Sequence, residues 1–364
     1  MPHFQHRTEE GTDRSRAGDA ELTAGVDTHL DTHTAAICDD RGRVLAQLQV
    51  AATTAGYAEL LAWADSTAAG RELTWAIEGT RHYGLGLARH LAAAGQRVSE
   101  ISGTRHIGKR RAGKSDPIDA VRAARELLAR PRDTQMRADG DREALRLLMT
   151  DRRNAVQSCR TTRAALASVL VTAPAPLREQ LRGLPSKRRA VACARLTCPP
   201  GADRLTRVTC QTIIHLGQRI TALAAAADGL EAQIAVIVED MAPGLVAAEP
   251  GLGALSAAQI LLSWSHAGRI TSEQAFAMLS GTAPVPVSSG RTDRHRLNRM
   301  GDRQLNRALH TIAVSRMRHH PPTLAYIERR RAQGKTDNEI RRCIKRYLAR
   351  HLYRTLSHAN PGSI

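Results

Sequence analysis

The chain has 364 residues, and its 53 Lys and Arg against 35 Asp and Glu give a formal net charge of +18 at pH 7. This length suits two or three domains, and 42% hydrophobic residues can fill a sizeable core, which excludes disorder throughout. The positive charge predicts an acidic partner. We expect a cytoplasmic, nucleoid-associated protein with no membrane partner, because no apolar run approaches the ~18 residues that span a bilayer and no apolar signal segment opens the chain.

The six cysteines are too few and too scattered for a disulfide framework, and they fit a reducing compartment. Cys193, Cys198, Cys210 and His215 have a spacing that could be extended into a zinc site, but the tight C-x2-C knuckle is missing. We therefore favour small buried thiols over zinc. Aromatic residues make up only 3% of the chain, which argues against a base-stacking platform for single strands and favours contacts with phosphates and duplex shape.

The N-terminal part alternates between strand and helix patterns. Residues 1–21 lack periodicity and are interpreted as a disordered tail, whereas residues 22–133 form the first predicted domain. Its strands are expected at residues 23–27, 34–38, 43–50, 73–77 and 97–101, and its helices at residues 54–64, 85–94 and 116–128. This order predicts an α/β domain, a mixed sheet covered by helices.

Residues 134–242 are interpreted as an all-α segment, a long coiled-coil arm. Two apolar series, over positions 145–169 and 209–237, step alternately by three and four residues, which is coiled-coil spacing. Prolines between positions 174 and 200 separate the two helices. A bundle packed within the monomer and an arm that pairs with another subunit both fit, and the second predicts self-association as a dimer or tetramer.

Residues 243–358 are expected to form a helical C-terminal domain. Its opening, Glu249-Pro-Gly-Leu-Gly-Ala-Leu-Ser256, resembles a helix-hairpin-helix element in which Ser256 is the N-cap of an apolar helix. Glycines in such a turn let backbone N–H groups approach a phosphate. An ordinary turn between helices fits the same residues.

The positive charge is concentrated near the C-terminus. Residues 290–364 contain 18 Lys and Arg and 5 Asp and Glu, a net charge of +13. Solvated faces and membrane-surface helices are also basic, but an Arg-rich composition without a Phe or Trp stripe favours nucleic acid. The candidate nucleic-acid-binding residues are Arg291, Arg294, Arg296, Arg299, Arg303, Arg307, Arg341, Arg342, Lys345 and Arg346.

Four carboxylates lie where a metal site could form. Asp27 and Glu78 end two strands, and Asp116 and Asp119 share one face at the start of a helix because they are three residues apart. Oxygen clusters of this kind bind Mg²⁺ or Mn²⁺, and two such ions can drive phosphoryl transfer. Each residue alone also fits a simpler role, as a helix cap or first-turn acid or as a polar strand end.

Taken together, these stretches resemble a known family. Three look like the DEDD motif of a RuvC-like, RNase H-type domain: Gly-Val-Asp27-Thr-His, Ile-Glu78-Gly-Thr and Lys114-Ser-Asp116-Pro-Ile-Asp119. Three more look like the serine-containing second domain of the same proteins: Gly281-Thr-Ala-Pro284, Ser288-Ser289-Gly290 and Arg299-Met-Gly301-Asp. Both domains occur, in this order, in the transposases of insertion-sequence family one hundred and ten, which includes the Piv/MooV DNA invertases.

The resemblance implies a site-specific DNA recombinase that moves its own element. In that family the carboxylates, here Asp27, Glu78, Asp116 and Asp119, bind magnesium. The serine of the Ser-Gly motif, here Ser289 or the adjacent Ser288, forms a covalent link to DNA. The implied partners are the DNA of the element ends and target, a guide RNA and further copies of the chain.

Two other functions fit the same residues. A RuvC-like, structure-specific endonuclease would cut with water as the nucleophile. A nucleic-acid-binding regulator would use no catalysis at all, and its carboxylates would act as caps.

Overall fold

The structure is a computed structural model that describes residues 21–80, 82–101, 116–129, 136–137, 139–266, 268–287, 295–296, 298 and 300–358. It comprises two compact units, residues 1–137 and 138–364. The C-terminal domain predicted from the sequence and all but the first four residues of the predicted arm fall in the second unit. Residues 1–20 of the predicted tail lie outside the described residues.

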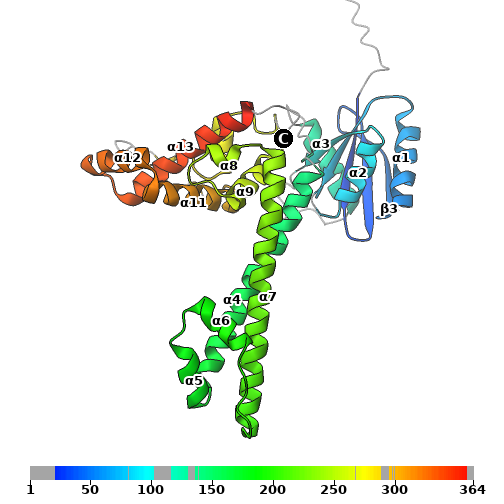
Figure 1. Cartoon of the computed structure of the whole chain (residues 1–364). Helices are drawn as coiled ribbons and strands as arrows, with labels where there is room; N and C mark the ends of the chain where they lie inside the picture. The colour runs from blue at the N-terminus through cyan, green and yellow to red at the C-terminus, as the bar shows by residue number, and fades with distance from the viewer. Residues whose placement is uncertain are drawn as a thin grey trace, which may run out of the picture. The chain divides into compact units, whose positions relative to one another are not determined.

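The first unit contains a five-stranded mixed sheet with helices (Figure 1). The strand order is β3-β2-β1-β4-β5, in which β2 is antiparallel to β1 and β3, while β1, β4 and β5 are parallel. The elements are β1 (Leu22–Thr28), β2 (Thr32–Cys38), β3 (Val44–Ala51), α1 (Thr54–Ala68), β4 (Leu73–Glu78), α2 (Leu85–Ala93), β5 (Arg97–Ile101) and α3 (Asp116–Leu128). The predicted mixed sheet is confirmed, and it fits an RNase H-like domain.

Alternation along the strands assigns the helices to opposite faces of this sheet. On one face, Val26 and Ile77 are buried in a core with residues of α1 and α2. On the other face, a smaller cluster joins β2 to α3 through residues such as Ala120. Asp27 and Glu78 alternate with Val26 and Ile77, so both side chains belong to the α3 face.

The contact between α3 and β1 depends on Gly25. A Cβ at this position would lie 2.1 Å from the carbonyl oxygen of Ala120 and 2.4 Å from the backbone nitrogen of Ala124. Only a residue without a side chain therefore lets the two backbones approach so closely. This contact holds the N-terminal turn of α3 near the end of β1.

Replacing Gly25 with Ala should push α3 away from the sheet. We expect the free energy of unfolding of the first unit to fall by about 1–3 kcal/mol, as for other overpacked cores. Urea unfolding followed by the fluorescence of the buried Trp75 would measure this change. Gly229, inside α7 (Arg204–Met241) with open space around its Cβ position, is the matched control. Gly229→Ala should be neutral or stabilising by up to about 1 kcal/mol, and an unchanged midpoint for Gly25→Ala would contradict the packing described above.

Two long antiparallel helices open the second unit (Figure 1). The elements of this hairpin are α4 (Asp141–Thr172), α5 (Ala175–Arg182), α6 (Ser186–Ala194) and α7 (Arg204–Met241). Arg152 of α4 pairs with Glu231 of α7 at 2.7 Å, and Cys159 lies against the carbonyl of Ile220 further along. The apolar stripes of α4 and α7 thus pack against each other within one chain. Of the two arrangements that the sequence allows, this is the bundle packed within the monomer.

The heptad pattern predicted for α7 is correct along one line and shifted beside it. Ile213, Ile220, Ala227 and Ile234, seven residues apart, are all buried. A second line of buried residues runs beside the first and includes Gly217, whereas the sequence pattern predicts that position 216 is buried instead. The reason is α6, which also packs on α7: a Cβ on Gly217 would lie 2.5 Å from the nitrogen of Ala194. A helix with two partners buries a wider stripe than a two-helix seam.

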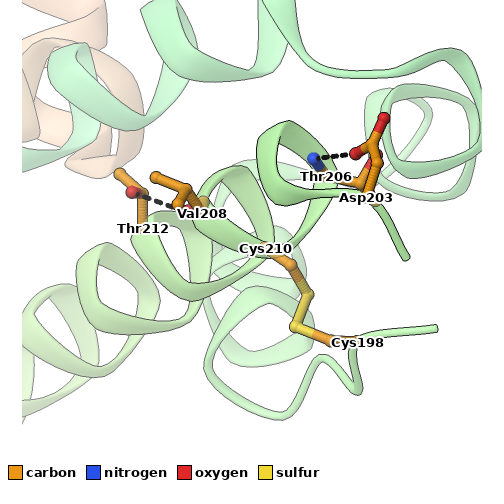
Figure 2. The surroundings of a disulfide bond; sticks show 6 residues. All are labelled: Cys198, Asp203, Thr206, Val208, Cys210 and Thr212. Carbon is orange, nitrogen blue, oxygen red and sulfur yellow. Dashed lines mark hydrogen bonds between the residues drawn. A yellow bond between two sulfur atoms is a disulfide. The ribbon is translucent and has the colours of Figure 1, made fainter. Parts of the chain in front are cut away.

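Cys198 and Cys210 form a disulfide near the start of α7 (Figure 2), with their Cα atoms 5.8 Å apart. The prediction of free thiols is therefore wrong for this pair, and the bridge removes two of the four side chains considered for zinc. The chain turns back between them, and Asp203 caps α7 by accepting a hydrogen bond from Thr206 N at 2.6 Å (Figure 2). Cys193 remains a buried free thiol, as predicted.

Helix α7 is long and apolar enough to cross a membrane by length and composition alone. One window of 18 residues has a mean hydropathy of 1.5, and 17% of that window is buried. The sequence criterion overlooked it because Asp228 and Glu231 interrupt the apolar stretch. The expectation that no segment reaches this length is thus corrected.

The rest of the second unit is a helical core around α9, and a small hairpin of two strands lies beside it. Its elements are α8 (Leu245–Ala248), α9 (Ala254–Trp264), α10 (Glu273–Leu279), β6 (Val285–Pro286), β7 (His295–Arg296), α11 (Arg303–His319), α12 (Pro321–Ala332) and α13 (Asp337–His358). Trp264 meets Phe276 and Tyr353 edge-on, with ring centroids 5.9 and 5.7 Å apart.

The predicted N-cap at Ser256 is wrong. Helix α9 begins at Ala254 with Gly253 as its N-cap, and Ser256 lies in the first turn, where its backbone nitrogen donates to the Gly253 carbonyl at 3.0 Å. The preceding turn is anchored by the buried carboxylate of Glu249, which pairs with Arg316 at 2.7 Å and with His351. The turn is thereby tied to α11 and α13.

Candidate functional site

The carboxyl ends of β1 and β4 bring two of the predicted carboxylates side by side. Val26 of β1 pairs with Ile77 of β4 in a parallel register, and Asp27 and Glu78 each follow by one residue. The hydroxyl of Thr28 also donates to the carbonyl of Glu78 at 2.8 Å, which fixes the ends of the two strands to each other. The chain then leaves β4 through Gly79 at φ +73°, a conformation that favours glycine.

The first turn of α3 supplies the other two carboxylates. The Nε2 atom of His29 lies 3.2 Å from Asp27 Oδ2 and 3.4 Å from Asp116 Oδ1, so one imidazole bridges both carboxylates. Within the described part of the chain, Asp27, His29 and Asp116 form a group that could hold a metal ion, because one potential ligand atom from each lies within 4.8 Å of the other two. Asp119 instead forms an ion pair with Arg122 at 2.7 Å, and Glu78 is outside the group.

The Asp27 carboxyl lies in an environment that disfavours its negative charge. Burial raises its pKa above the usual value, and the charges of Asp119 and Asp116 raise the pKa further. The neighbouring His29 acts in the opposite direction and lowers it. A cation at this position would relieve the repulsion between the carboxylates.

His29 was not among the candidate residues, although it lies two positions after Asp27. In an extended segment, residues two positions apart point to the same side, so the sequence does contain a signal that His29 lies beside Asp27. Its contact with Asp116 depends on how α3 packs on the sheet, and no local pattern shows that packing.

A basic cavity of about 1050 Å³ lies among α11, α13 and the hairpin of β6 and β7. Seven cationic side chains and one carboxylate, Glu339, contribute to its lining. The cationic residues are Arg296, Arg303, Lys335, Arg342, Lys345, Arg346 and Arg350. This cavity is the strongest candidate for a nucleic-acid interface in the second unit.

Five of the predicted nucleic-acid-binding residues line this cavity: Arg296, Arg303, Arg342, Lys345 and Arg346. Arg307 and Arg341 are not part of the lining, and Arg291, Arg294 and Arg299 lie outside the described residues. The sequence pattern missed Lys335, which follows Gly334 at φ +76° in the turn between α12 and α13. Lys335 is separated in the sequence from the arginine-rich stretches, so no local charge pattern pointed to it.

Several cationic side chains in the cavity are held in place by polar contacts. Lys345 Nζ donates to Asn306 Oδ1 at 2.7 Å, and Asn306 Nδ2 donates to the Ser280 carbonyl at 2.7 Å. Burial, together with the nearby charge of Arg341, lowers the pKa of Lys345. Glu273 of α10 binds Arg350 at 2.7 Å and Arg346 at 3.1 Å.

Ser288 and Ser289 fall between β6 and β7 in the sequence and lie outside the described residues. The two chain segments that flank this connection are fixed to each other. A Cβ on Gly301 would lie 2.5 Å from the nitrogen of Gly281, and Asp302 N donates to the Leu279 carbonyl at 2.6 Å. The motif residues around the serines therefore form a close backbone contact.

Two family models match the chain. A transposase model for the DEDD domain of the IS110 type covers residues 24–173, and a model described as "Transposase IS116/IS110/IS902 family" covers residues 245–328. The chain is also 30% identical to the "Insertion element IS900 uncharacterized 42 kDa protein" of Mycobacterium paratuberculosis, over 86% of this chain and 90% of that protein. It is 33% identical to the "Insertion element IS110 uncharacterized 43.6 kDa protein" of Streptomyces coelicolor, over 38% of this chain and 34% of that protein.

Both transposase models match in order along one chain, and the relative from IS900 is matched over nearly its whole length. These matches indicate a DNA-processing enzyme of the transposase and recombinase class. The chain belongs to the IS116/IS110/IS902 family of transposases.

Proposed function

We propose that this transposase moves its own element as a site-specific recombinase, using carboxylate-bound magnesium and a serine nucleophile. The observation that best supports this function is the convergence of Asp27 and Asp116 at the carboxyl edge of the sheet, on the face to which Glu78 also belongs. A DEDD transposase domain implies the use of a divalent cation. Helix caps and strand ends alone would not require carboxylates from β1 and α3 to meet at one imidazole.

The residues present fit a hard divalent cation. Asp27, Glu78, Asp116 and Asp119 would hold it, since carboxylate oxygens are the ligands that Mg²⁺ and Mn²⁺ prefer. When bound, such an ion stabilises negative charge on phosphate oxygens and activates a nucleophile. Around it, Arg122 orients Asp119, and the imidazole of His29 offers a nitrogen that can hold or release a proton beside Asp27.

Asp27→Asn should weaken binding of Mn²⁺, used as a spectroscopic probe, by at least about tenfold. The substitution keeps the shape of the side chain but removes the charge on which the cluster depends. Electron paramagnetic resonance titration of the full chain would measure the affinity. Asp39→Asn is the matched control, because Asp39 lies in the turn between β2 and β3, bound to Arg43. Equal Mn²⁺ affinity for Asp27→Asn and the unchanged protein would contradict the metal site.

Ser289 is the proposed nucleophile. Attack of its hydroxyl on a DNA phosphate would form a phosphoserine ester, and the leaving oxygen of the cut strand would take up a proton to become a hydroxyl. A serine hydroxyl is a weak nucleophile and needs cationic or metal assistance. Two observations on the flanking residues support this proposal: Gly281 and Gly301, on either side of the serines in the sequence, are in close contact, and both line the basic cavity.

Incubation with element-end DNA, flanking RNA and magnesium, followed by denaturation in detergent, should yield a covalent protein–DNA adduct. We expect Ser289→Ala to abolish the adduct and Ser288→Ala to retain it, measured as a mobility shift of labelled DNA. Cleavage that survives both changes and is lost in Asp27→Asn would favour the water-using endonuclease. Binding without cleavage would favour the regulator.

We infer that the basic cavity contributes to binding of DNA and of a guide RNA from the element, in a cytoplasmic protein associated with the nucleoid. Its seven cations suit phosphates, and each phosphate contact should add roughly −0.7 (single strand) to −0.9 (duplex) to the slope of log affinity against log salt.

Exchange between two DNA sites requires more than one catalytic centre, so we also propose a dimer or tetramer. The stripes of α4 and α7 pack on each other, so another surface must mediate association. Exposed apolar residues of α7 such as Leu205, Val208 and Val236 are available. Light scattering should detect a mass above that of one chain when DNA is present, and a monomeric mass with and without DNA would count against assembly.

A further inference from the structure

The basic cavity contains an exposed aromatic side chain. Tyr347 of α13 lines the cavity and keeps 53% of its surface exposed. Its ring stands perpendicular to that of Tyr326 in α12, with centroids 5.8 Å apart. The guanidinium groups of Arg329 and Arg330 lie over the Tyr326 ring, 5.4 and 5.9 Å from its centroid. The Tyr326 ring is therefore already in contact with cations, and it packs against the Tyr347 ring.

The surroundings of Tyr347 suit phosphates. Lys345 and Arg346 precede it on α13, and Arg342 and Arg350 lie within two turns, all of them lining the same cavity. Asn306 holds the ammonium of Lys345 at 2.7 Å, so this cation is fixed before any ligand binds. An aromatic face among fixed cations is the combination that binds unpaired nucleotides, because the base stacks while the backbone is neutralised.

The size of the cavity also favours a single strand. A volume of about 1050 Å³ is comparable to the larger pockets that enclose small ligands, roughly 300–1000 Å³. Duplex DNA is normally read by a protein element that enters its groove, which requires a protruding helix or ribbon rather than a concavity. The site therefore fits a short unpaired segment better than a double helix.

We propose that this cavity binds an unpaired segment of a nucleic-acid strand, with one base stacked on Tyr347 and the adjoining phosphates held by Lys345 and Arg342. This assignment rests on the proposed nucleic-acid function of the second unit and specifies the form of its ligand. It also departs from the expectation, based on the low aromatic content, that base stacking is absent.

Binding of short fluorescein-labelled strands to the full chain tests the assignment. Oligothymidine and an abasic strand of equal length carry the same phosphates and differ in the bases. We expect the unchanged protein to prefer oligothymidine by about tenfold, Tyr347→Leu to lose this preference without losing affinity for the abasic strand, and Tyr347→Phe to retain it. Arg342→Gln should instead weaken both strands and reduce the salt slope by about 0.7.

The base preference separates stacking from a merely structural role, which would weaken binding of both strands equally. Equal affinity of the unchanged protein for the two strands, no binding of either, or a preserved preference in Tyr347→Leu would overturn the proposal. Parallel titrations with oligouridine identify whether RNA or DNA is the preferred source of the strand. The adduct assay on Ser289 is independent: an adduct without base preference overturns the cavity assignment alone, and base preference without an adduct overturns the nucleophile alone.

Discussion

The close backbone contact between α3 and β1 is the constraint on which the candidate catalytic site depends. Gly25 lets the carbonyl of Ala120 approach to a distance that no side chain would permit. Since Asp27 follows Gly25 by two residues on the same strand face, the contact also determines how near the first turn of α3 comes to Asp27. Displacement of the helix would move Asp116 away from Asp27 and from the imidazole of His29 that contacts both.

The second unit uses the same device at two other places. Gly217 brings α6 against α7, and Gly301 brings the segment after the serine connection against Gly281. In both units, residues without side chains determine the distances, and two of these contacts, at Gly25 and at Gly301, adjoin the candidate carboxylate site and the basic cavity. Removal of a charge should therefore alter function with little effect on folding, and an added methyl group at a contact should alter both.

The parts of the fold that follow from local pattern could be predicted from the sequence. Alternation identified the strands of the sheet, and spacing by seven identified the buried line of Ile213, Ile220 and Ile234. What could not be predicted depends on contacts between distant segments. His29 meets Asp116 only because α3 packs on β1, and Gly217 is buried only because α6 returns to α7. The same holds for the Cys198–Cys210 bridge, which requires a chain reversal that the spacing of the cysteines does not reveal.

The long hairpin of α4 and α7 has a mechanical consequence. A helix of 38 residues is about 57 Å long at 1.5 Å per residue. Its partner α4 packs along it through the Arg152–Glu231 ion pair and through separate apolar clusters on either side of that pair, so the two helices together resist bending more than either alone. A rotation of about 10° at one end would move the other end by about 10 Å, since displacement scales with the length of the helix. The length of the hairpin thus amplifies any small rotation at one of its ends.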